Sequence, residues 1–263
     1  MHYFNPPLLN AISQAVVGMV DDLEVQSCAL LADCNLHCQQ DIDDCLWSAV
    51  SRFISSSREA EARGGDELPE VYARLAADMR VDNFGVVGTR WIFEAFHVRD
   101  PPGEFCVRAL QNILGRSSVL DEGPHKFQVN AYAEYDLTVS EARLRGSISR
   151  DNGCNDATIL TPRWLRSASL PINAFVSREQ CAEFQVLEFA CDVFFGSARS
   201  SSATCFSEIS GDVYMLVTGA CCVSCIGAVR QFQLLWPNVS VHIRMESRHF
   251  LRRETKCCSS GKK

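Results

Sequence analysis

The stretch from residue 212 to residue 245 constrains the fold most, because it predicts three consecutive elements with clear limits. Residues 212–218 form an apolar run that is typical of a strand. Residues 222–236 have apolar residues at helical spacing, and Pro237 ends this helix because proline cannot continue it. Residues 239–245 alternate Val, Val, Ile and Met with other residues, which predicts another strand. Strands that alternate with helices indicate an α/β fold.

The same alternation begins upstream, near residue 127. Residues 127–137 and 143–149 have the composition of strands, and 170–176 is a candidate for a short strand. Ser177 can cap a helix that spans 178–195. From residue 127 the predicted order is strand, strand, helix, strand, helix, strand. We therefore expect an α/β domain with a mixed sheet flanked by helices.

The first half of the chain is predicted to be mainly helical. Apolar residues recur at helical spacing within 8–56 and 68–79, and 105–114 is a candidate for a short helix. Residues 55–66, which include two consecutive glycines, have the composition of a linker. We expect three parts in all: a helical N-terminal extension at 1–125, the α/β domain at 126–256 and a disordered tail at 257–263.

The composition indicates a soluble globular protein, with 47% hydrophobic and 22% charged residues. No apolar run approaches the roughly 20 residues of a transmembrane helix, so we expect no membrane partner. The first basic side chain is Arg52, which does not fit a secretory signal or a mitochondrial transit peptide. The expected location is therefore the cytosol or the nucleus, where the 14 cysteines would serve as thiols and metal ligands rather than disulfides.

The net charge of −7 is unevenly distributed along the chain. Residues 1–127 contain 19 acidic and 10 basic side chains, whereas 128–263 contain 13 acidic and 15 basic ones. The most basic stretch is the C-terminal one. A polyanion is therefore expected to meet the C-terminal half, although a solvated basic tail is an equally simple interpretation. The basic residues of this stretch are Arg244, Arg248, Arg252, Arg253, Lys256, Lys262 and Lys263.

Three cysteines have the pattern of a catalytic metal site. Cys222 and Cys225 lie three residues apart in the first turn of a predicted helix, so both sulfurs share one face. The positive end of that helix favours their thiolate forms. Cys181 lies near the start of the preceding predicted helix and can supply a third ligand. Catalytic zinc sites use three protein ligands and leave the fourth position open.

Glu183 lies two residues after Cys181 and has a different expected role. It is in helical register with Leu187, Ala190 and Phe194, which define an apolar face. A carboxylate on such a face is costly to bury unless it has a task. Moving the proton of a metal-activated water is such a task, so we expect Glu183 to be a general acid–base.

These residues resemble the zinc-dependent deaminases of the cytidine deaminase superfamily. That family carries His-x-Glu or Cys-x-Glu on one helix and Pro-Cys-x-x-Cys on the next. This chain has Cys-Ala-Glu at 181–183 and Cys-Cys-Val-Ser-Cys at 221–225. The resemblance covers 170–245 well, 127–169 loosely and 1–126 not at all. It implies a zinc ion on the three cysteines, a water activated for attack on C4 of cytosine, proton transfer by Glu183 and release of ammonia.

Two departures from the family pattern affect the interpretation. Cys221 replaces the usual proline before the paired cysteines, and Cys181 stands where nucleic-acid editors usually have His. Three thiolates give a zinc site a net charge of −1, which a nearby cation would offset. Arg178 is the nearest such cation along the sequence.

Asn173 matches an asparagine that contacts the nucleoside in nucleoside cytidine deaminases, so the resemblance implies a substrate contact there.

Two substrate classes fit the pattern, and the nucleic acid is slightly favoured over the free nucleoside. The long extension and the basic tail favour cytosine within a single-stranded or flipped nucleic acid, whereas Cys181 and Asn173 favour free cytidine or deoxycytidine; C6 of adenine is not excluded. Arg163 and Trp164 can hold a phosphate and stack a base, or they can be a surface arginine and a core tryptophan. A third possibility is a non-catalytic, zinc-stabilised interaction protein. Glu188 and Asp192 are interpreted as part of a solvated helix face.

Overall fold

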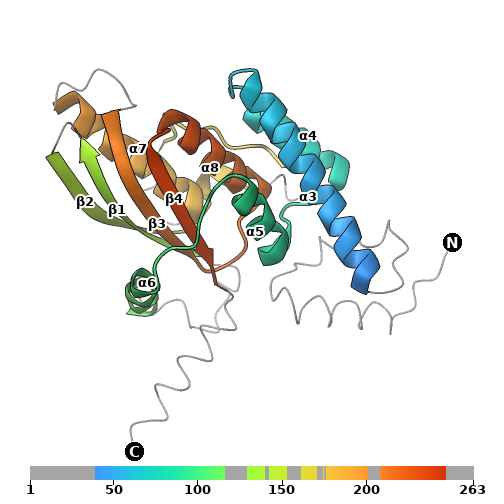
Figure 1. Cartoon of the computed structure of the whole chain (residues 1–263), viewed down its shortest axis with the longest axis horizontal. Helices are drawn as coiled ribbons and strands as arrows, with labels where there is room; N and C mark the ends of the chain where they lie inside the picture. The colour runs from blue at the N-terminus through green and yellow to red at the C-terminus, as the bar shows by residue number, and fades with distance from the viewer. Residues whose placement is uncertain are drawn as a thin grey trace, which may run out of the picture.

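The computed structural model describes residues 39–115, 129–139, 142–152, 161–170, 174, 176–200 and 208–246. These residues form a mixed α/β structure in which helices flank a four-stranded sheet (Figure 1). The strand order is β2-β1-β3-β4. The predicted fold class, a mixed sheet flanked by helices, is therefore confirmed at this level. No helix within these ranges is long and apolar enough to span a bilayer.

The sheet combines an antiparallel hairpin with a parallel pair. Strands β1 (Asn130–Val139) and β2 (Ala142–Asp151) are antiparallel neighbours, and β1 also pairs with β3 (Ile209–Val217) in antiparallel fashion. Strand β4 (Val239–Met245) runs parallel to β3. A parallel neighbour requires a crossover connection, which is helix α8 (Val223–Leu235). The start of α8 consequently follows the end of β3.

Side chains alternate between two covered faces of the sheet. Helices α7 (Ala182–Ser200) and α8 cover one face, and α6 (Gly103–Gly115) packs on β1 and β3 through a separate cluster (Figure 1). In β1 the buried Ala131 and Ala133 belong to the core under α7 and α8, whereas Tyr132 belongs to the cluster under α6. This period of two is the expected consequence of a pleated strand between two layers.

The N-terminal helices share the core of the sheet domain. Helices α3 (Gln39–Ala62) and α4 (Leu68–Met79) pack together, and α4 contacts α8. Tyr72 of α4 lies over Gly227 of α8, where a Cβ atom would come within 2.4 Å of the ring. Arg230 of α8 forms a half-buried ion pair with Glu61 of α3 at 2.7 Å. Side chains from α3 to β4 therefore form one continuous hydrophobic cluster.

Several element predictions are corrected by the structure. The linker expected at 55–66 is wrong, because α3 continues to Ala62 and only the turn around Gly64 and Gly65, with φ of 109° and 79°, separates it from α4. Helix α5 (Gly85–Ala95) was not predicted. The described residues within 170–176 do not form a strand, and the helix expected from 178 begins with a 3-10 turn, Arg178–Gln180, before α7. Residues 8–38 of the predicted N-terminal helix lie outside the described ranges.

Glu188 is fully buried rather than solvated, so that interpretation is wrong. Its carboxylate accepts hydrogen bonds from the backbone N–H groups of Arg163, Trp164 and Leu165, the last two at 3.0 Å. Asp192, one turn further, accepts from the indole N–H of Trp164 at 2.8 Å. The two acids therefore fix the segment 161–166 along α7, since buried backbone donors need partners.

Candidate metal centre

Three thiols converge at the starts of α7 and α8. The Sγ atoms of Cys181 and Cys222 lie 4.0 Å apart, those of Cys222 and Cys225 lie 3.5 Å apart, and all three fall within 4.8 Å of one another. No other group of three His, Cys, Asp or Glu side chains in the described part of the chain comes together in this way. The cluster can hold a metal ion, and it contains the three residues predicted as ligands.

The local backbone explains why two of the thiols are paired. Cys222 is the N-cap of α8, with extended backbone angles of −72° and 163°. Its sulfur accepts a hydrogen bond from the backbone N–H of Cys225 at 3.4 Å, as a serine or aspartate does at other N-caps. The capping geometry therefore turns both sulfurs to the same side of the first turn. The partial positive charge of the helix end favours a thiolate there.

Cys181 reaches the cluster from a different element. It follows the 3-10 turn Arg178–Gln180 and immediately precedes α7, with extended backbone angles of −60° and 136°. Its backbone carbonyl accepts from Gln185 N at 3.0 Å, the first bond of the helix. The thiol is half-buried, whereas those of Cys222 and Cys225 are buried. Cys181 is therefore the most exposed of the three cysteines.

The thiols influence one another electrostatically. Hydrogen bonding between Cys222 and the thiols of Cys181 and Cys225 holds the pKa of Cys222 well below its usual range, and the positive charge of Arg178 acts in the same direction. Burial alone would lower the pKa of Arg178, but the neighbouring Cys222 and Asp82 raise it. The first thiolate of the cluster is therefore expected on Cys222, the N-cap.

Glu183 lies buried beside the cluster, with 4% of its surface exposed. Burial raises the pKa of Glu183 to about 7, and the negative charge of Cys222 adds to this effect. The thiols of Cys221 and Cys225 hydrogen-bond to the carboxylate and oppose the rise. The predicted general acid–base is thus next to the thiols and can be either protonated or ionised near neutral pH.

Arg178, which was predicted only as the nearest cation along the sequence, lies beside the thiols. Its guanidinium is within electrostatic reach of Cys222 and Cys181 and forms an ion pair with Asp82 at 2.5 Å. Both charged groups are nearly buried, with exposed fractions of 10% and 4%. The role of Asp82 has no signal in the sequence, because Asp82 lies 96 residues before Arg178 and no local pattern links them.

The structure does not bring the other predicted site residues to the thiols. The ring of Trp164 packs on Phe195 with centroids 4.4 Å apart, and its indole N–H is bonded to Asp192. Asp192 follows Cys181 by 11 positions, which corresponds to about 16 Å along a helix. Arg163 precedes Trp164 and is exposed, so neither residue is next to the cluster. Asn173, together with Arg248, Arg252 and Arg253, lies outside the described residues.

We predict that the purified chain binds about one Zn²⁺ and that Cys222→Ala with Cys225→Ala abolishes this binding, because a site that loses two of three thiols cannot hold the ion. Metal analysis after dialysis is the measurement. Cys191→Ala is the matched control, since Cys191 is a buried cysteine of α7 that bonds to Trp236 and lies outside the cluster. Full zinc occupancy in the double variant would contradict the assignment.

We also predict a pH effect on the metal-free protein. The pKa of Glu183 is raised from 4.5 to about 7 in the folded state, so folding is favoured when this carboxyl is protonated, and that contribution is lost as the pH rises through this window. The free energy of unfolding should fall more in the wild type than in Glu183→Gln between about pH 5 and about pH 8, by roughly 2 kcal/mol. Urea unfolding of both proteins measures the difference. Parallel pH profiles of the two proteins would show that the pKa of Glu183 is not raised.

Comparison of the chain with protein-family models, with curated proteins and with solved structures finds no match. The centre must therefore be interpreted from its own geometry: three thiols that can hold a metal ion, with a buried carboxylate and a buried cation beside them.

Proposed function

We propose that this chain is a zinc-dependent hydrolytic deaminase that converts cytosine to uracil. The observation that carries the proposal is the position of Glu183 beside three convergent thiols at the starts of two helices. Cys181 and Glu183 belong to the start of α7, Cys222 and Cys225 to the start of α8, and β3 lies between the two helices in the chain. This is the order of elements that the resemblance to zinc deaminases implies.

The donor set supports zinc as the metal. Thiolates are soft ligands that suit zinc, and hard cations such as Mg²⁺ prefer oxygen. A tetrahedral site with Zn–S bonds of about 2.3 Å places neighbouring sulfurs about 3.8 Å apart. The sulfur of Cys222 lies 4.0 Å from that of Cys181 and 3.5 Å from that of Cys225, which is close to this spacing, and all three sulfurs lie within 4.8 Å of one another. Three protein ligands leave room for a fourth that is not protein.

The side chains around the thiols have separable tasks in this reaction. A zinc ion held there would make a water molecule acidic enough to lose a proton near neutral pH. Glu183, a buried carboxylate beside the thiols, can accept that proton and return it to the departing amine. Arg178 offsets the excess negative charge of three thiolates, which would otherwise oppose proton loss.

For the substrate we favour cytosine in a single-stranded or flipped nucleic acid, and free cytidine is the alternative. The support is the charge distribution, with the basic residues concentrated after Arg244. The described residues contain neither Asn173 nor this basic stretch beyond Glu246. The preference therefore stays a proposal that rests on the sequence.

One observation favours a second function. Cys221 is a fully buried thiol next to Cys222 and hydrogen-bonds to Glu183. A shift of this thiol onto the metal would complete four sulfur ligands, as in closed structural zinc sites. The chain would then be a zinc-stabilised interaction protein without catalysis. In the described geometry Cys221 is not part of the cluster of three thiols.

The catalytic part of the proposal predicts that Glu183→Gln keeps its zinc and loses deamination by about 10²–10⁴-fold, the usual contribution of a general acid–base. Ammonia release from a cytosine-containing oligonucleotide and from cytidine is the measurement. Glu188→Gln is the matched control, because it removes the charge of another buried carboxylate of α7 that is bonded to backbone amides instead. Wild-type rates in Glu183→Gln would rule out the mechanism.

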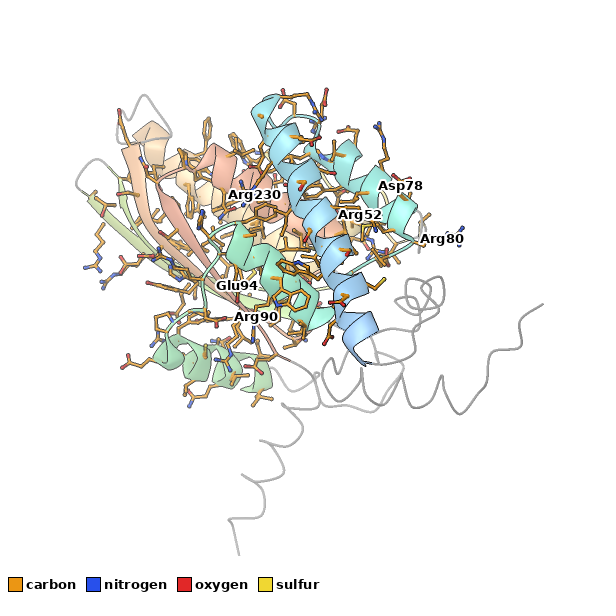
Figure 2. The ribbon with its side chains drawn as sticks, turned by 45° about the vertical axis from the view of Figure 1, so that its right-hand side comes forward. Arg52, Asp78, Arg80, Arg90, Glu94 and Arg230 are labelled. Atoms are coloured by element: carbon orange, nitrogen blue, oxygen red, sulfur yellow. The ribbon has the colours of Figure 1, made fainter. Side chains whose placement is uncertain are left out.

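The substrate part predicts that replacing Arg248, Arg252 and Arg253 by Ala weakens deamination of the oligonucleotide and flattens its salt dependence, because fewer counterions are released on binding. Deamination of free cytidine should stay unchanged, since a nucleoside carries no phosphate. The control replaces Arg52 and Arg90, two exposed arginines of the N-terminal helices (Figure 2). Equal behaviour of the triple variant and the wild type on both substrates would favour the nucleoside.

A further inference from the structure

The short segment between α4 and α5 lies against the start of α8. Helix α4 ends at Met79, near the labelled Asp78 and Arg80 in Figure 2, and α5 begins at Gly85. The carbonyl of Asp82, between them, accepts a hydrogen bond from the backbone N–H of Val223 at 2.8 Å. Val223 is the first residue of α8, so this bond satisfies one of the donors that the first turn leaves open.

Two further contacts connect the same segment to the thiol cluster. Asn83 forms an isolated antiparallel bridge with Cys222, and its side-chain oxygen accepts from the backbone N–H of Gly85 at 2.9 Å. The carboxylate of Asp82 forms the 2.5 Å ion pair with Arg178. The segment therefore contacts the N-cap cysteine through its backbone and the cation beside the thiols through its side chain.

The free-energy cost of burying the Asp82–Arg178 ion pair indicates that the pair has a role beyond stability. Two charges that are at least nine-tenths buried are costly to remove from water, and their mutual attraction often only offsets that cost. Well-packed apolar residues in place of a buried ion pair are often as stable or more stable, so stability alone does not account for this pair. A cation fixed beside three thiols, by contrast, balances a metal site whose net charge would be −1.

We propose that Asp82 is a positioning residue of the metal centre, and that the N-terminal helices are thereby an obligatory part of it. Asp82 orients Arg178 beside Cys181 and Cys222, and its carbonyl holds the first turn of α8. Metal binding is consequently coupled to the packing of α4 and α5 on the sheet domain. This inference rests on the metal-binding part of the proposed function and does not depend on deamination.

The chain offers a matched control for a merely structural role. Arg230, labelled in Figure 2, forms a second ion pair between α8 and the N-terminal helices. Its partner is Glu61, and the exposed fractions of the two side chains are 12% and 16%. Like the pair of Asp82, it joins the two halves of the chain. Unlike that pair, it lies beyond the first turn of α8, and no thiol of the cluster contacts it. Breaking each pair in turn separates helix packing from metal binding.

The first test is the zinc affinity of Asp82→Asn, measured by competition with a chromophoric chelator. Outer-shell partners of a metal site typically contribute about 10–100-fold to metal affinity, and a loss of up to this range is expected when Arg178 loses its charged partner. Asparagine has nearly the same shape and keeps the backbone bond to Val223, so the change isolates the charge. Glu61→Gln should lower stability and leave zinc affinity unchanged. Equal zinc affinities in Asp82→Asn and wild type would overturn the inference.

The second test uses the wild-type chain and does not require a variant to fold. Backbone amide hydrogen exchange is measured with and without Zn²⁺. Zinc should slow exchange at Val223 and also within 81–92, because a ligand that stabilises one of two coupled segments protects the other. Protection confined to α7 and α8 would overturn the inference while leaving the metal site intact. A wild-type chain that binds no zinc would contradict both this inference and the proposed function.

Discussion

The centre depends on the parallel pairing of β3 with β4. Parallel neighbours cannot be joined by a tight turn, so the chain must cross over the sheet, and α8 makes this crossing. The first turn of α8, with its open backbone donors and positive dipole end, consequently follows the end of β3. Cys222 and Cys225 occupy that turn, and the start of α7 brings Cys181 to it. The topology of the sheet thus places two of the thiols in the first turn of α8, and the start of α7 supplies the third.

The charges around the thiols form one connected set. Glu183 is buried beside the thiols, and Arg178 is held beside them by its ion pair with Asp82. The carboxylates of Glu183 and Asp82 and the guanidinium of Arg178 therefore lie where water screens their charges little. Such an arrangement opposes folding, because each buried charge must be compensated by a neighbour. Residues that lower stability without a structural reason are typical of functional sites. The cluster therefore combines the two properties expected of a reactive metal centre, convergent ligands and costly buried charge.

The parts with strong local signals were predictable. The helix Leu68–Met79 and the strand Val239–Met245 have the predicted limits, and the three predicted ligands lie together. Helix Gly85–Ala95 was missed because its valines, threonine, isoleucine and glycines weaken the helical signal, and its packing on α3 decides its structure. The pairing of Asp82 with Arg178 was beyond prediction, since it joins two elements that only the tertiary fold places together. Local sequence patterns therefore indicated the three cysteines. The charged residues around them could be identified only from the tertiary structure.

The central claim is an open centre with three thiolate ligands, and the coordination shell of the zinc-loaded protein tests it most directly. X-ray absorption at the zinc edge distinguishes sulfur from lighter ligands by distance and scattering. The account predicts about three sulfurs at about 2.3 Å and one nitrogen or oxygen at about 2.0 Å. Four sulfurs at about 2.3 Å, with Cys221 as the fourth, would describe a closed structural site and contradict the account.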